Sequence, residues 1–160
     1  MTQPKDWFKL GRLANAEQCE AAAEESIKST SHGTDVPQYT TKCEEIMRQV
    51  LEDHGIRLDQ QADYLKPGTK RRAQAIAQFR PNPTLASSSR VLLLIALTTL
   101  DKRNGMFSFL EAPEDRSIPH HEWKEEQIVI EPGEGVMWRG DCARKIGEGN
   151  GGIMLIIRYD

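Results

Sequence analysis

The hydrophobic and polar positions follow two different patterns, which change near residue 65. Before that point, apolar residues recur every three or four positions, as in amphipathic helices. Residues 15–28 show this spacing behind Asn15, a residue type that caps helix N-termini. Residues 41–54 show it behind a Thr41/Glu44 capping box. The sequence predicts one helix over each range.

After residue 65, short β-rich runs alternate with proline and glycine, which predicts antiparallel strands. The runs cover residues 72–80, 91–99, 106–110, 127–131, 135–142 and 153–159. The runs at 91–99 and 153–159 are apolar at successive positions, so both of their faces must be covered. We therefore predict a mainly β fold with N-terminal helices (α+β): an antiparallel β-barrel or jelly roll with two helices packed outside.

The length of the chain limits the number of domains, and its charge limits the classes of partner that we expect. A chain of 160 residues is the length of one ordinary domain, so we expect a single domain in which residues 1–65 form a helical cover and residues 66–160 form the barrel. The net charge of −3 and the short basic run Lys70–Arg72 argue against nucleic acid as a partner.

Three cysteines without disulfide or zinc spacing, and an N-terminus without a signal-peptide pattern, predict a cytoplasmic protein. Its longest apolar run, Val91–Leu100, is half of the roughly 20 residues that a membrane helix needs. A membrane partner is therefore not expected.

Three segments after residue 76 carry a family resemblance: residues 77–82, 97–115 and 128–141. They contain Leu100-Asp101 followed by Asn104-Gly105, the Ala112–Asp115 loop, and the Pro132–Gly135 corner with the apolar strand behind it. This succession resembles the double-stranded β-helix, or cupin-like fold, of the iron(II)/2-oxoglutarate dioxygenases, especially the phytanoyl-CoA dioxygenase-like branch. The resemblance covers roughly the last 85 residues, and it implies the same jelly roll.

In that family, a His-x-Asp or His-x-Glu pair and a later histidine hold the iron. The resemblance places the first pair near Arg80-Pro81-Asn82 and the later histidine near Ala143-Arg144, and neither segment contains a histidine or carboxylate. No histidine follows His121. We therefore expect a member of this fold that lacks the iron-binding triad and uses no metal or other cofactor.

Candidate chemistry concentrates on residues 138–144. Along a strand, Arg139 and Asp141 share one face, whereas Trp138 and Cys142 share the other. An inward Arg139/Asp141 pair would supply a cation and a proton-transferring carboxylate, and an outward pair would be an ordinary salt bridge. If Trp138 and Cys142 point inward instead, the cavity is apolar and Cys142 is a packed side chain.

The remaining candidates lie near the predicted mouth of the barrel. His121 is the third catalytic candidate, and its alternative is an exposed histidine. Trp123, Trp138, Arg80 and Arg144 are candidate substrate-binding residues, with a surface arginine as the alternative for Arg80.

Three functions remain open on these residues. The first is a metal-independent enzyme, an isomerase, cyclase or lyase that acts on an apolar small molecule in a biosynthetic pathway. The second is a non-catalytic ligand-binding or interaction domain, and the third is an iron(II)/2-oxoglutarate-dependent dioxygenase. A homodimer also stays open.

Overall fold

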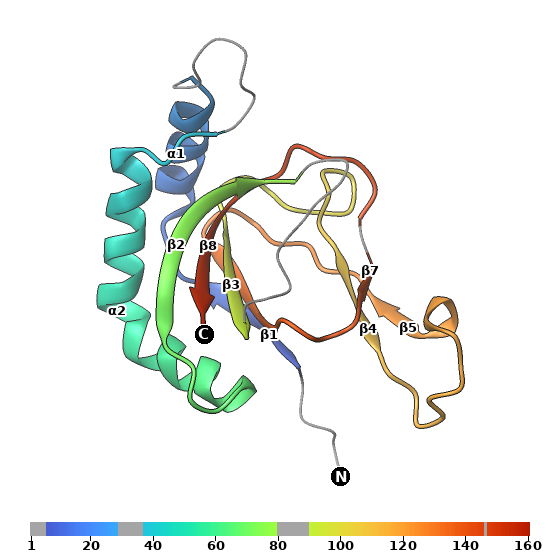
Figure 1. Ribbon diagram of the computed structural model, residues 1–160. Coiled ribbons are helices and arrows are strands. Elements are labelled where there is room, and N and C mark those ends of the chain that lie inside the picture. Colours follow the sequence, from blue (N-terminus) through green and yellow to red (C-terminus); the bar gives the residue numbers. More distant parts are fainter. Residues whose placement is uncertain (1–5, 29–36, 80–89, 146) are drawn as a thin grey trace.

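The computed structural model of the chain describes residues 6–28, 37–79, 90–145 and 147–160 (Figure 1). Its elements are, in chain order, β1 (Trp7–Arg12), α1 (Ala16–Lys28), α2 (Thr41–Leu65), β2 (Arg71–Gln78), β3 (Val91–Ala96), β4 (Ser108–Glu111), the 3-10 turn η1 (His120–Glu122), β5 (Lys124–Glu126), β6 (Glu134–Arg139), β7 (Arg144–Lys145) and β8 (Ile153–Tyr159). Both predicted helices and most of the predicted strands are present.

The strands form two antiparallel sheets. The large sheet has the strand order β1-β6-β3-β8-β2, and the small sheet has the order β5-β4-β7. The strand predicted at 127–131 is not formed: this segment makes only an isolated bridge, between Ile130 and Leu100, and the nearest strand is β5. Both helices lie on the outer side of the large sheet, away from the small sheet (Figure 1). The predicted jelly roll with two helices outside is confirmed.

The central strand β3 shows why the sheet needs two covers. All six of its residues are buried. Leu92, Leu94 and Ala96 pack between the two sheets, whereas Val91, Leu93 and Ile95 pack in the cluster that contains the helices. Two hydrophobic cores therefore meet at this strand, which explains its uninterrupted apolar sequence.

Helix α2 begins at Thr41, as predicted, but it continues to Leu65. Its N-cap is Thr40, whose side-chain oxygen accepts a hydrogen bond from the Cys43 N–H, so the predicted cap was one residue late. Gly55 does not end the helix. Leu58 and other buried apolar residues continue the stripe beyond it, and tertiary packing outweighs the low helix propensity of glycine.

Strand β1 is an element that the sequence analysis did not predict. It lies within the region expected to be only helical, and it pairs with β6 in the register Trp7↔Trp138. The N-terminal region therefore contributes an edge strand to the large sheet in addition to the two helices.

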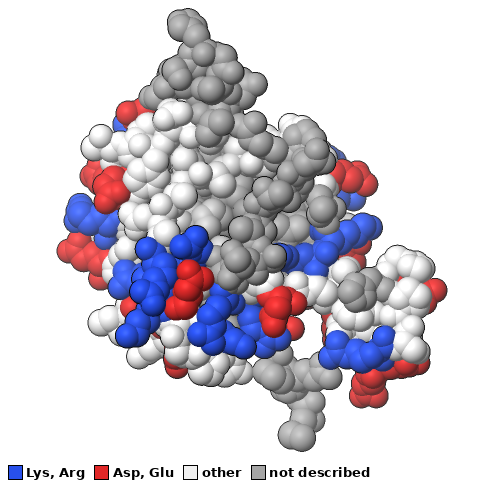
Figure 2. Space-filling view, viewed as in Figure 1, with Lys and Arg blue, Asp and Glu red and all other residues white. Residues whose placement is uncertain are grey.

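The surface carries both signs of charge. On the face shown in Figure 2, basic and acidic side chains lie next to one another. Within the described part of the chain, no helix is long and apolar enough to cross a membrane.

Candidate functional site

An aromatic cluster occupies the space between the two sheets. Phe107 and Phe109 come from the small-sheet side, and Trp138 comes from β6 of the large sheet. The Phe107 ring centre lies 5.0 Å from that of Trp138 and 5.3 Å from that of Phe109, both in edge-to-face contact. Trp7 stacks on Phe109 at 4.5 Å. These contacts give the interior an apolar wall with defined geometry.

Arg144 brings a positive charge into this cluster. It pairs with Phe109 across the β4–β7 ladder, so both side chains lie on the same face of the small sheet. Its guanidinium carbon lies 5.5 Å from the Phe107 ring centre and 5.7 Å from the Trp138 ring centre. The cation is therefore held between aromatic rings from both sheets, a favourable cation–π arrangement.

Two hydrogen-bond donors in this region are buried without a partner among the described residues. They are Nη1 of Arg144 and the indole Nε1 of Trp138. A buried donor that makes no hydrogen bond costs about 1–3 kcal/mol. An acceptor oxygen from a bound molecule would remove that cost, so these donors are a candidate binding position.

Trp138 belongs to the inner cluster and Cys142 packs against it, which resolves the orientation that the sequence left open. Arg139 points away from that cluster. Its Nε lies 2.5 Å from Asp141 Oδ1, and its Nη2 lies 3.1 Å from Asp6 Oδ1. The hydrogen bond with Asp141 raises the pKa of Arg139 above its ordinary value. The side chain of Asp141 is 68% exposed, so this pair lies at the rim.

Cys142 is half-buried beside the inner cluster. Burial raises the pKa of its thiol to about 12, which keeps the thiol protonated at neutral pH. A protonated thiol is a weak nucleophile, so the environment of Cys142 favours packing over covalent catalysis.

A cleft of about 1590 Å³ opens beside the cluster and brings three of the predicted site residues together. Arg139 and Asp141 line one part of it, and Trp123 lines another. The stacked rings of Trp7 and Phe109 belong to the same lining. Trp123 is held in place because its indole N–H donates to the Ile118 carbonyl at 2.8 Å.

The other predicted site residues lie elsewhere. His121 is exposed in η1 and is not among the residues that line the cleft, although its neighbour Glu122 is. Trp138 belongs to the interior cluster, and the half-buried Arg144 lies over its ring; neither is among the residues that line the cleft. Arg80 lies outside the described residues. Catalytic roles for Arg139, Asp141 and His121 stay predictions.

Sequence reasoning missed the aromatic residues Trp7, Phe107 and Phe109. The alternation of Phe107 and Phe109 around Ser108 was a usable signal, because residues two apart on a strand share a face. Trp7 gave no such signal, since its strand was not predicted.

Several solved structures share this fold. AviO1 from Streptomyces viridochromogenes Tue57 has a TM-score of 0.59 at 15% identity, over 96% of this chain and 89% of that one. The non-heme alpha ketoglutarate dependent epimerase SnoN from nogalamycin biosynthesis has a TM-score of 0.61 at 10% identity, over 96% and 78%. The viral collagen prolyl hydroxylase from Paramecium Bursaria Chlorella virus-1 has a TM-score of 0.58 at 9% identity, over 99% and 94%.

These similarities show that the fold is the double-stranded β-helix, or cupin-like jelly roll. No protein-family model matches the chain. No curated protein matches it either.

The fold raises the question of whether the interior could hold iron. Within residues 6–28, 37–79, 90–145 and 147–160, no group of three or more His, Cys, Asp or Glu side chains is arranged to bind a metal. The half-buried Arg144 guanidinium beside the aromatic rings carries only donors and cannot ligate a metal. The described donor set does not fit iron, and we derive no step through it.

Proposed function

We propose that the chain is a metal-independent enzyme that binds a small, largely apolar molecule between its two sheets. It would isomerise, cyclise or cleave that molecule without oxidising it. The observation that carries this proposal is the pair of buried donors without partners among the described residues, Arg144 Nη1 and Trp138 Nε1, inside an aromatic cluster.

A substrate with a carboxylate or carbonyl oxygen fits these donors. Arg144 binds the oxygen through a charge-assisted hydrogen bond, and the indole N–H of Trp138 supplies a second donor. The surrounding rings exclude water, which strengthens both interactions. The apolar remainder of the substrate packs against Phe107 and Phe109.

The same donors would stabilise a reaction intermediate. When a proton leaves the carbon next to a carbonyl group, negative charge develops on the carbonyl oxygen. Arg144 and Trp138 would stabilise that enolate oxygen. Asp141 is the predicted proton acceptor, and return of the proton to another carbon gives an isomer with the same atoms and the same oxidation state.

Two observations support independence from iron. Among the described residues, no group of three His, Cys, Asp or Glu side chains could hold a metal ion. The segment Arg80-Pro81-Asn82, near which the resemblance places the first ligand pair, contains no histidine or carboxylate.

A non-catalytic binding domain is the second candidate. It is favoured by the position of Asp141, which is largely exposed and already paired with Arg139. In that case Arg144 and Trp138 would bind the ligand, and no base would act on it.

The first experiment is a thermal-shift screen of aliphatic and aromatic carboxylates and ketones against the wild type, Arg144→Gln and Arg139→Gln. The proposal predicts compounds that raise the melting temperature of the wild type and of Arg139→Gln but not of Arg144→Gln. Arg139→Gln is the matched control, because it removes a guanidinium at the rim. If every compound that raises the melting temperature of the wild type also raises that of Arg144→Gln, the proposed site is refuted.

The hits then separate the candidate functions. Incubation in D₂O, followed by proton NMR, detects exchange at the carbon next to the carbonyl group. An enzyme exchanges that proton in the wild type and loses the exchange in Asp141→Asn, whereas a binding domain exchanges nothing. Release of succinate from 2-oxoglutarate, dependent on added iron(II), would instead establish the dioxygenase alternative.

A further inference from the structure

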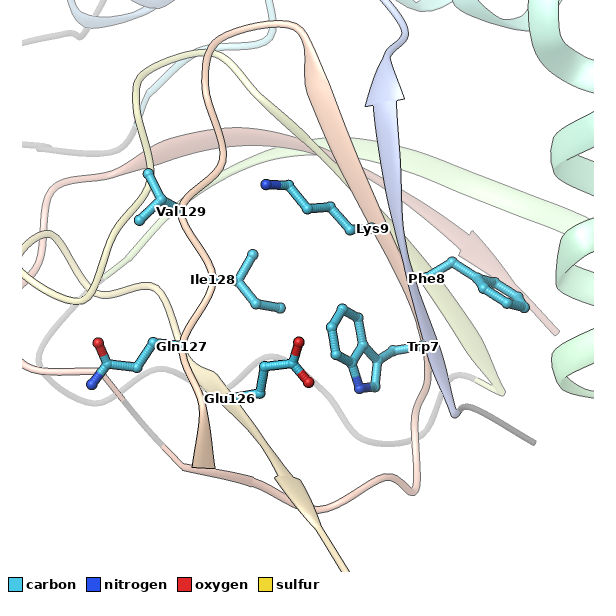
Figure 3. Close-up of a pocket in the computed structure, with 7 residues that line it drawn as sticks. All are labelled: Trp7, Phe8, Lys9, Glu126, Gln127, Ile128 and Val129. Atoms are coloured by element: carbon cyan, nitrogen blue, oxygen red, sulfur yellow. The ribbon is translucent and has the colours of Figure 1, made fainter. Parts of the chain in front are cut away.

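The two sheets leave an open seam where their edge strands face each other. Strand β1 is one edge of the large sheet, and β5 is one edge of the small sheet. Between them lies a groove of about 360 Å³, lined by residues 7–9 and 126–129, which we call the seam. Trp7 and Lys9 point toward the opposite segment, as Glu126 and Ile128 point toward β1, whereas Phe8 points away (Figure 3).

The backbone of β1 offers hydrogen bonds to this seam. The Arg139 N–H donates to the Asp6 carbonyl at 2.8 Å, which makes these residues a hydrogen-bonded pair next to the register pair Trp7↔Trp138. In an antiparallel ladder, successive residues turn their N–H and C=O groups to alternate sides. The backbone of Phe8 therefore exchanges hydrogen bonds with β6, whereas Lys9 turns its N–H and C=O away from β6, to the open edge of β1 beside the seam. Such an edge is a template for an additional strand.

The charges around the seam indicate the charge of the molecule that it would bind. The seam opens into the cleft, because Trp7, Phe8 and Glu126 line both. Together they present six carboxylates (Asp6, Glu111, Glu114, Glu122, Glu126, Asp141) and four cations (Lys9, Arg116, Lys124, Arg139).

Most of the cations are already engaged. Arg139 pairs with two carboxylates, Lys124 pairs with Glu111, and Arg116 lies over Trp123. Glu114, Glu122 and Glu126 form no ion pair within the described residues. The surface is therefore complementary to a basic occupant.

We propose that the seam binds an extended, basic peptide segment of a partner protein as an added strand on β1. The main chain of the peptide pairs with Lys9 in the manner of β-augmentation. An apolar side chain of the peptide fits between Trp7 and Ile128, and a basic side chain reaches Glu126. This interaction site is separate from the Arg144 site and does not depend on the proposed enzymatic function.

A random peptide library displayed on phage, selected against the immobilised full chain, tests this proposal. Enriched peptides are synthesised with a fluorescent label, and their affinities are measured by anisotropy. We expect basic sequences with alternating β-branched residues. Lys9→Pro removes the outward N–H and breaks no ladder bond with β6, so it should weaken binding about tenfold or more. Lys9→Ala keeps the N–H and should stay within about threefold of the wild type, or bind more tightly.

A second pair of variants tests the charge without changing the backbone. Glu126→Lys should weaken basic peptides about fivefold at low salt, and by less at high salt. Gln127→Lys is the matched control, because that side chain points away from the groove (Figure 3). Melting curves show whether each variant is folded. If Lys9→Pro does not fold, the comparison of Glu126→Lys with Gln127→Lys tests the proposal instead.

Three outcomes would overturn the proposal. One is a selection that enriches no peptide, and another is a set of peptides that bind Lys9→Pro and Glu126→Lys as tightly as the wild type. The third is a dimer, seen in sedimentation and lost in Lys9→Pro, which would assign the seam to a second copy of the chain. Arg144→Gln should leave peptide binding unchanged, so failure of one site does not affect the test of the other.

Discussion

At the scale of single residues, we expect Arg144 to lower the stability of the fold and to favour ligand binding. Its guanidinium gains cation–π contacts with Phe107 and Trp138, but one of its nitrogens is buried with no hydrogen-bond partner in the described chain. Replacing a buried charge by an apolar side chain of similar length is often neutral or stabilising. A side chain that carries such a cost in the fold is expected to act on a ligand.

We predict that Arg144→Met raises the free energy of unfolding by about 1 kcal/mol and abolishes ligand binding. Urea titration followed by circular dichroism measures the first effect, and the thermal-shift screen measures the second. Arg139→Met, which loses only exposed ion pairs, should change stability by less than about 1 kcal/mol. Strong destabilisation by Arg144→Met would show that the guanidinium supports the fold.

A second prediction concerns alkaline pH. Burial raises the pKa of the thiols of Cys19 and Cys142 to about 12, whereas an unfolded thiol titrates near 8.5. The folded chain therefore holds these protons more tightly than the unfolded chain. Their contribution to stability is complete below about pH 8.5 and is lost as the pH rises toward 12.

Urea titrations from pH 8 to pH 11 should show a falling free energy of unfolding. The free energy of unfolding of Cys142→Ala should fall less steeply with pH, because one of the two titrating thiols is gone. Identical slopes for the wild type and Cys142→Ala would mean that this thiol is already ionisable in the folded state.

At the scale of the elements, the sequence predicts those helices and strands whose own hydrophobic pattern identifies them. The doubly apolar strands β3 and β8 and the apolar stripe of α2 are local signals, and they identify the fold. Strand β1 has no such pattern: in its sequence WFKLGR, Leu10 is buried and the other residues are exposed or half-buried, and it is a strand because β6 supplies its hydrogen bonds.

The candidate site depends on long-range pairing in the same way. Arg144 reaches the interior because the β4–β7 register places it opposite Phe109. Arg139 stays at the rim because Asp6, far away in sequence, comes close enough to pair with it. Periodicity along a single strand separates the faces of residues 138–142, but only the assembled sheets show which face is inside.

The turn that leads into β6 is a further element whose residues can be tested. Gly133 has a φ of +90°, and a Cβ atom there would lie 2.2 Å from the Ala14 carbonyl oxygen. Its own carbonyl accepts hydrogen bonds from the N–H groups of Leu13 and Ala14. This contact joins the end of β1 to the start of β6 and leaves no room for a side chain.

We predict that Gly133→Ala lowers the free energy of unfolding by about 2–4 kcal/mol, because the new methyl group forces the two segments apart. Gly11→Ala is the control: a Cβ there meets no atom within 4 Å, and the change should be below about 1 kcal/mol. Thermal and urea unfolding measure both. Equal effects at the two positions would contradict the structural account of this turn.

At the scale of the whole molecule, the helices and the large sheet share one hydrophobic core. Buried residues of α1 and α2, among them Cys19, Met47 and Leu58, belong to the same cluster as Leu93 of β3 and Ile157 of β8. Without residues 1–65, this face of the sheet would be exposed to water, and β6 would lose its partner β1. The region 66–160 therefore contains the jelly-roll strands β2 to β8 but not the cover that makes them stable.

We predict that a fragment of residues 66–160 does not fold cooperatively on its own, because it exposes the apolar outer face of β3, β6 and β8. It should aggregate or bind the dye ANS strongly, and it should lack the near-ultraviolet circular dichroism that the buried Trp138 gives in the full chain. Adding residues 1–65 as a separate chain supplies β1 and both helices, so it should restore part of that signal. A cooperative urea transition of the fragment alone, with the near-ultraviolet spectrum intact, would show that the jelly roll is an independent domain and that the helices are a dispensable cover.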